Sequence, residues 1–277
     1  MGRLIFFLYL CCSFIICSAK AQTIQSLNIA PERTIPGVFS KCYVDNLGNI
    51  FVLLDNNIRI KKLSAEGDSL QLSDNLNQYG NIYSMDVTNP LKILVYYKDY
   101  ATVLILDRFL NAVNTIDLKQ AGILQARAVA SSYDGNVWVY DEQNAQIKKI
   151  DVNGNVLFAS TDLRNVFPDA PDPTKIIDNS GQLYLYDPHV GWLLFDYYGA
   201  FRQKLEYPGL EDVCVVNNIL CGRTGDTIWM YDPKKMIDQR FTTPATTGME
   251  NAKQIVISGN KLFVLKTDGL DVYDVRQ

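Results

Sequence analysis

Residues 135–155, GNVWVYDEQNAQIKKIDVNGN, determine the fold because the same pattern recurs elsewhere in the chain. Residues 48–68, GNIFVLLDNNIRIKKLSAEGD, align with them without a gap at an offset of 87 and are identical at eight of 21 positions. A third copy, GQLYLYDPHVGWLLFDYYGA, begins at Gly181. Each copy contains short runs rich in Val, Ile, Leu, Tyr and Trp between Gly, Asn or Asp turns. This pattern predicts successive antiparallel strands.

The spacing of the copies gives the number of units. An offset of 87 is two periods of about 43 residues, and a weaker unit does lie between the first two copies, at residues 92–97 and 103–107. One residue that closes the third strand of each unit recurs every 36 to 45 positions, at Ser64, Asp107, Asp151, Asp196, Asp232 and Asp274. Six four-stranded units of this length predict an all-β fold, a six-bladed β-propeller, whose radial closure protects the sheet edges.

The two ends of the chain are predicted to close the ring together. The sixth unit has room for three strands only, at residues 253–257, 261–266 and 270–275. Upstream of the first unit, residues 24–35 form an extra segment with a strand-like start. We expect this N-terminal segment to supply the missing outer strand of the last blade. Residues 22–277 then form one propeller domain.

The first 21 residues have the pattern of a secretory signal peptide. Arg3 precedes an apolar run over residues 4–17, and Ala19-Lys20-Ala21 offers small side chains for cleavage. The run is too short to span a bilayer, so we expect no transmembrane segment. We predict export to the periplasm or the cell surface. A lipid anchor is the rival interpretation, although the residues before Cys12 and Cys17 do not match a bacterial lipobox.

The third unit resembles a known blade type. Its stretch DGNVWVYDEQNAQIKKIDVNGN, residues 134–155, is similar to the NHL-type blade, with Asp-Gly-Asn, an apolar strand, Asp, Asn, a second apolar strand and a Gly turn. The chain thus resembles six-bladed propellers of the NHL-like or TolB-like type over residues 39–275. The Ala21-Gln22 cleavage site resembles those of exported proteins of the Bacteroidetes. This resemblance implies a fold, but such propellers include lyases, lactonases, sensors and scaffolds.

Charge and composition exclude several functions. Lys and Arg number 26 against 30 Asp and Glu, a balance that excludes an obligatory nucleic-acid binder. The NHL-like lyases that the fold resembles use several histidines on a zinc ion, whereas this chain has one, His189. Calcium-dependent lactonase-like propellers use Glu, Asn and Asp around the axis, and no such set stands at equivalent inner-strand positions. We therefore expect no catalytic residues, no metal and no cofactor.

A cationic channel mouth is the main candidate binding site. The inner strand of each blade begins at one face, and its first residues include Lys41, Arg127, Lys175 and Lys253, with Tyr83 and Asp212 in the other two units. On an acidic protein these cations indicate a site for a carboxylate, a phosphate or an acidic loop. The alternative is solvated charge at the edges of loops. His189 lies in a loop on the same face, either as part of a site or as an exposed turn residue.

Three cysteines remain after cleavage, namely Cys42, Cys214 and Cys221, which excludes a disulfide scaffold. A two-residue turn at Asn217-Asn218 places Cys214 directly opposite Cys221. The pair is therefore a possible disulfide, or two buried thiols that act as small hydrophobes.

These observations favour an exported, non-catalytic propeller that binds another protein of the cell envelope as a binding or scaffold module. The argument against an enzyme is that the sequence contains no Gly-x-Ser-x-Gly motif, no phosphate loop and no cluster of metal ligands. The alternative function is a site at the central channel that binds a small anion or acts as a calcium-dependent, lactonase-like hydrolase.

Overall fold

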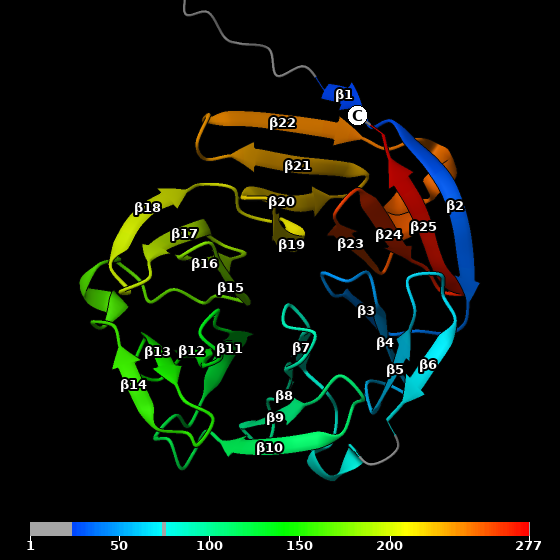
Figure 1. Cartoon of the computed structure of the whole chain (residues 1–277). Helices are drawn as coiled ribbons and strands as arrows, with labels where there is room; N and C mark the ends of the chain where they lie inside the picture. The colour runs from blue at the N-terminus through cyan, green and yellow to red at the C-terminus, as the bar shows by residue number, and fades with distance from the viewer. Residues whose placement is uncertain (1–23, 74–75, 277) are drawn as a thin grey trace, which may run out of the picture.

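The structure is a computed structural model that describes residues 24–73 and 76–276. The described residues form six sheets arranged around a central axis (Figure 1). The predicted all-β fold, a six-bladed β-propeller, is confirmed. The expected signal peptide, residues 1–21, lies outside the described residues. No helix in the described ranges is both long and apolar enough to cross a membrane.

Blades are numbered 1 to 6 along the chain, and the strands of each blade are called a to d from the axis outward. Blade 1 contains β3 (Lys41–Val44), β4 (Ile50–Leu54), β5 (Arg59–Leu63) and β6 (Ser69–Leu72). Blade 2 contains β7 (Ser84–Asp86), β8 (Ile93–Tyr97), β9 (Thr102–Leu106) and β10 (Ala112–Asp117). Blade 3 contains β11 (Ala126–Ser131), β12 (Val137–Asp141), β13 (Gln146–Ile150) and β14 (Val156–Ala159).

The remaining blades follow the same plan, with a different outer strand in the last one. Blade 4 contains β15 (Lys175–Asn179), β16 (Gln182–Asp187), β17 (Gly191–Asp196) and β18 (Phe201–Leu205). Blade 5 contains β19 (Glu211–Val216), β20 (Ile219–Thr224), β21 (Thr227–Asp232) and β22 (Ile237–Thr242). Blade 6 contains β23 (Gln254–Ser258), β24 (Lys261–Leu265), β25 (Gly269–Val275) and β2 (Ile29–Pro36). Short 3₁₀ turns lie in the connections between blades, at η1 (Asn77–Tyr79), η2 (Leu163–Asn165), η3 (Ala245–Thr247) and η4 (Met249–Asn251).

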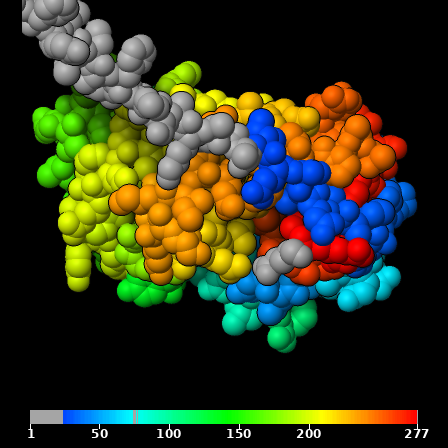
Figure 2. All heavy atoms as spheres, turned by 90° about the horizontal axis from the view of Figure 1, so that it is seen from above, coloured from blue at the N-terminus to red at the C-terminus, as the bar shows by residue number. Residues whose placement is uncertain are grey.

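The N-terminal segment closes the ring and also extends a second blade. Strand β2 pairs antiparallel with β25 from Ile29↔Val275 to Pro36↔Gly269, as the missing outer strand requires. Before it, β1 (Ile24–Ser26) pairs in parallel with β22 as a fifth strand of blade 5. Figure 2 shows these N-terminal residues against the last two blades. The sequence predicted one strand here, whereas the segment divides between two sheets.

Acidic side chains at the ends of the c strands hold the c–d turns. Asp151 Oδ1 accepts hydrogen bonds from the backbone N–H groups of Asn153 and Asn155, at 2.8 and 2.9 Å. Asp107 and Asp196 accept the same pair of bonds, from the residues two and four positions later. An Asp carboxylate stabilises a tight turn by bonding the backbone a few residues on. This geometry explains why the period of the fold is countable from these residues.

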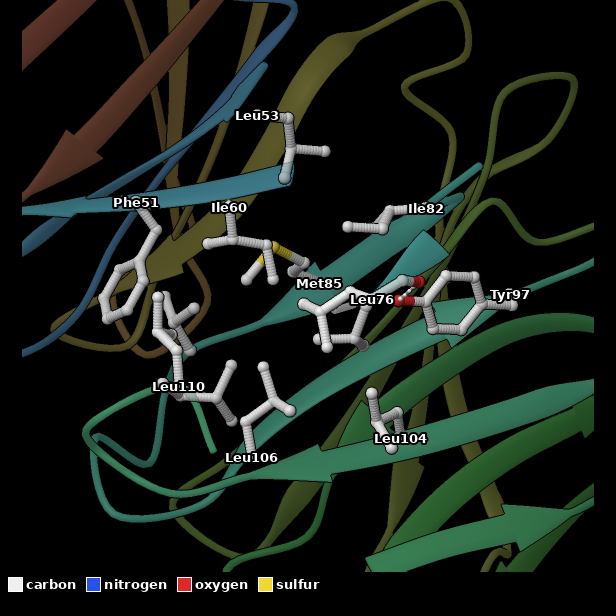
Figure 3. Packing of buried hydrophobic residues seen from close by; sticks show 13 residues of the cluster. Phe51, Leu53, Ile60, Leu76, Ile82, Met85, Tyr97, Leu104, Leu106 and Leu110 are labelled. Atoms are coloured by element: carbon white, nitrogen blue, oxygen red, sulfur yellow. Dashed lines mark hydrogen bonds between the residues drawn. The ribbon is translucent and has the colours of Figure 1, made fainter. Parts of the chain in front are cut away.

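Large apolar side chains fill the spaces between adjacent blades. Between blades 1 and 2, Phe51, Leu53 and Ile60 face residues of the next blade (Figure 3). The facing side chains include Met85, Leu104, Leu106 and Leu110. Tyr97 is fully buried, and its hydroxyl donates to the carbonyl of Leu76 at 3.0 Å. Each such side chain contributes about 1.5–3 kcal/mol by leaving water, so each blade is stabilised mainly by its two neighbours.

Polar side chains join the inner strands of neighbouring blades at all six junctions of the described ring. Gln254 of blade 6 donates to the carbonyl of Cys42 in blade 1 at 3.0 Å, and its Oε1 accepts from the N–H of Cys42 at 2.8 Å. The backbone edge of β3 is thereby paired as if by another strand. The other five junctions use Lys41 Nζ to Tyr83 O, Asp86 to Ser131 N, Asp178 to Tyr133 N, Asn179 Nδ2 to Asn218 Oδ1, and Asp212 to Ile255 N.

Deletion of the closing segment tests this architecture. Removal of residues 22–36 takes away β1 and β2 and leaves β25 as an open edge, so we expect the melting temperature to fall by more than about 10 °C relative to residues 22–277. Removal of residues 22–26, which deletes only β1, should cause a smaller shift. Circular dichroism melts provide the measurement. A 22–36 deletion that melts like residues 22–277 would contradict closure by β2.

Candidate functional site

The two ends of the propeller carry different loops. Because the four strands of a blade alternate in direction, the d–a connections and the b–c loops lie at one end, and the a–b and c–d turns lie at the other. We call the first end the mouth face, since the inner strands begin there, and the second end the opposite face. The six residues that the sequence places at the channel mouth all belong to the mouth face.

Lys41 is the most constrained cation of the mouth. Its Nζ donates to the carbonyl of Tyr83 at 2.5 Å and lies 5.7 Å from the centroid of the Tyr83 ring. Burial and the nearby charge of Lys175 both lower the pKa of Lys41. Lys41 and Lys175 begin the inner strands of blades 1 and 4, so the channel mouth brings together cations from opposite sides of the ring.

Two other predicted mouth residues are held by structural contacts. Arg127 forms an ion pair of 2.5 Å with Asp172, in the connection that leads into blade 4. Asp212 accepts from Arg223 Nε at 2.8 Å and from the Ile255 N–H at 2.9 Å. Burial raises the pKa of Asp212 although Arg223 opposes the shift. Both charges therefore serve the junctions between blades.

The remaining predicted residues are more exposed. Lys253 reaches the carbonyl of Phe39 at 3.4 Å, a long contact. Lys175 is exposed and has no ion pair with any described residue. His189 is exposed in the b–c loop of blade 4, where its backbone N–H donates to Asp187. No hydrogen bond or ion pair among the described residues joins the His189 side chain to the mouth lysines.

A small polar cavity opens on the mouth face between blades 1 and 2. Its volume is about 150 Å³, and Lys41, Tyr83 and Lys98 are among its lining residues. The Nζ of Lys98 lies 5.0 Å from the Tyr83 ring centroid. Lys98 was not predicted, because it comes from the b–c loop of blade 2 rather than from an inner strand. Its position directly after the apolar run of β8 was the signal that places it on this face.

The opposite face carries an aromatic cluster that the sequence analysis also missed. Tyr133 is 72% exposed and Tyr198 is 82% exposed, and both contact Tyr197. The ring centroids lie 4.7 Å apart for Tyr133 and Tyr197 and 6.4 Å apart for Tyr197 and Tyr198. We call these three residues the tyrosine patch. Other exposed apolar side chains on the turns of this face are Leu47, Leu91, Phe109 and Met236.

A buried lysine holds the tyrosine patch in place. Lys149 Nζ lies 3.7 Å from the ring centroid of Tyr197 and 4.4 Å from that of Trp138, and it donates to Asp134 at 2.9 Å. The Tyr197 hydroxyl also donates to Asp134, at 2.7 Å. Cation–π contacts of this kind are strong where the cation is desolvated. The patch is therefore a fixed surface across blades 3 and 4.

Cys214 and Cys221 are direct partners in the register of β19 and β20, as the turn count predicts. Asn217 and Asn218 both have the left-handed backbone, with φ of 51° and 64°, that a two-residue hairpin turn requires. The structure contains both cysteines as free thiols. A hydrogen bond with Cys221 lowers the pKa of Cys214. Cys221 also lines an apolar cavity of about 160 Å³ between blades 5 and 6.

Metal-ligand geometry was searched over the described ranges. Within residues 24–73 and 76–276, no group of three or more His, Cys, Asp or Glu side chains lies where it could hold a metal ion. The inner-strand carboxylates of Asp86, Asp178 and Asp212 instead accept hydrogen bonds from backbone N–H groups of neighbouring blades.

The fold and these surfaces define a six-bladed β-propeller with a cationic channel mouth and an aromatic opposite face. The chain is similar to a streptogramin B lyase structure, with 15% identity and a TM-score of 0.59 over 85% of this chain and 78% of that one. For virginiamycin B lyase from Staphylococcus aureus the values are 10%, 0.60, 91% and 99%. For the Pan2 WD40 domain of Neurospora crassa they are 11%, 0.57, 92% and 98%.

At these identities the likeness shows the fold alone. The matched structures include lyases as well as WD40 domains, so the comparison does not select a function. No family model matches the chain, and no curated protein matches it.

The hydrogen bonds on Asp134 predict a pH-dependent contribution to stability. Burial raises the pKa of this carboxyl, but the bonds from Tyr197 and Lys149 outweigh burial and hold the pKa well below its usual range. The charged form therefore stabilises the fold above about pH 5, and this contribution is lost as the pH falls below about 4. We expect Asp134→Asn to lower the free energy of unfolding by about 1 kcal/mol at neutral pH.

Urea unfolding of both proteins at about pH 7 and about pH 3 measures this effect. The difference between the parent and Asp134→Asn should shrink at the lower pH. The exposed Asp169, varied to Asn, is the control and should show little difference at either pH. A difference for Asp134→Asn that stays constant with pH would contradict the assignment.

Proposed function

We propose that this protein is an exported bacterial propeller of the NHL-like or TolB-like type that binds another protein of the cell envelope. It acts without catalysis, as a binding or scaffold module. The observation that carries the proposal is the tyrosine patch on the opposite face. The proposed export depends on residues 1–21, whose composition is that of a signal peptide.

The tyrosine patch has the properties of a protein-binding surface. Tyrosine is enriched among the residues that dominate binding energy at interfaces, because it combines a large apolar ring with a hydroxyl. Tyr133 and Tyr198 are among the most exposed large side chains of the described residues, so their rings are available to a partner. The contacts of Lys149 with Tyr197 and Trp138 hold the surface in place before binding, which reduces the entropy lost on association.

The inner strands support a non-catalytic role. A calcium-dependent hydrolase at the channel needs carboxylate and amide oxygens that converge on one ion. Asp86 and Asp212 direct their carboxylates to the backbone of the next blade, and Gln254 directs its amide to Cys42. These side chains therefore stabilise the ring, and the acids among them are occupied by backbone donors rather than grouped around a cation.

A capture experiment with surface variants tests the proposal. Residues 22–277 are immobilised and exposed to solubilised envelope of the host, and the bound proteins are quantified by mass spectrometry. We expect a specific protein to be captured by the parent and to be reduced at least about tenfold by the double variant Tyr133→Ser, Tyr198→Ser. Both side chains are mostly exposed, so the variant should melt like the parent.

Two controls on the mouth face separate this surface from the channel. Leu124→Ser removes another exposed apolar side chain, 55% exposed, and Lys175→Glu reverses an unpaired charge. Both should retain the partner. Arg127→Glu is a poorer control, since it would place a carboxylate beside Asp172. A partner that is retained by the tyrosine variant but lost by Lys175→Glu would contradict the proposed face and support the alternative site at the channel.

A further inference from the structure

The cavity between blades 1 and 2 gathers positive charge without a carboxylate to pair with it. Lys41 donates only to a backbone carbonyl, and Lys98 contacts the face of Tyr83. Neither amine has an ion pair with any described residue. Asp99 also lines the cavity and offsets one charge, while Lys175 adds another from across the channel mouth. The mouth therefore keeps a net positive charge on a protein whose overall formal charge is −4.

Neutral hydrogen-bond donors lie beside these amines. Asn57 lines the cavity, and its Oδ1 accepts from Ser40 Oγ at 2.6 Å. This bond orients the Asn57 amide and leaves its N–H groups as donors. Asn81 lines the same cavity. Ammonium groups and amide N–H groups that converge on a small cavity have the donor character that oxyanions require.

We propose that this cavity binds a small molecule through a phosphate or carboxylate group, with Lys41 and Lys98 as its charged donors and Asn57 as a neutral donor. The volume of about 150 Å³ accommodates one such group and little more of the ligand. An oxyanion placed there relieves the repulsion between Lys41 and Lys175, two cations that otherwise face each other with one amine partly buried. The site lies on the mouth face, so it is independent of protein binding at the tyrosine patch.

Isothermal titration calorimetry at low ionic strength tests this site with two probes, inorganic phosphate and succinate. For residues 22–277 we expect at least one probe to bind in a 1:1 ratio with a dissociation constant below about 1 mM. Lys41→Met and Lys98→Met should each weaken binding about tenfold or more, because each removes one charged donor and keeps most of the aliphatic stem. The stronger probe distinguishes a phosphate ligand from a carboxylate ligand.

Lys119→Met is the matched control, since Lys119 is exposed on a connection of the same face and the variant changes the net charge by the same amount. It should bind like the parent. Absence of binding by both probes, or equal weakening by Lys119→Met and Lys98→Met, would overturn the proposal. Melting curves confirm that each variant is folded. Because Lys98→Met leaves the opposite face intact, it should still capture a protein partner, so the two proposals fail separately.

Discussion

The free backbone edge of each inner strand is the constraint on which this propeller depends. Six strands face the channel with N–H and C=O groups that no fifth strand can pair, and buried groups of this kind are costly when they lack partners. Side chains from neighbouring blades provide partners at each junction of the described ring, most completely where Gln254 bonds both backbone groups of Cys42. That junction joins the last blade to the first, so the same interaction also closes the circle.

This constraint influences where function resides. Polar inner-strand residues such as Asp86 and Asp212 are directed to backbone donors and not to a common reaction centre. The groups that remain available come from loops and strand ends, namely the lysines of the mouth face and the tyrosine patch of the opposite face. The fold thus presents two separate surfaces, with a cationic cavity at one end of the channel and a rigid aromatic surface at the other. The apolar cores between blades keep these surfaces at a fixed distance.

The sequence predicts the fold well because its repeat is local. The turn acids, such as Asp151, mark each unit, and the three-stranded last unit indicates which strand is missing. Strand β1 could not be predicted, since residues 24–26 are too few for a pattern and their parallel pairing with β22 depends on the closed ring. Lys98 and Tyr198 were missed for a similar reason, because their neighbours come from other blades. The pairing of Arg127 with Asp172 likewise depends on a loop whose path the sequence does not determine.

The most direct test of the account is native-state hydrogen exchange, measured by NMR, at the inner-edge amides of Cys42, Ser131 and Ile255. Each of these N–H groups donates to a side chain of a neighbouring blade. If these bonds hold the ring together, the three amides should exchange only on global opening, with protection within about tenfold of the central-strand amides. Fast exchange at these positions, with the central strands still protected, would contradict the account.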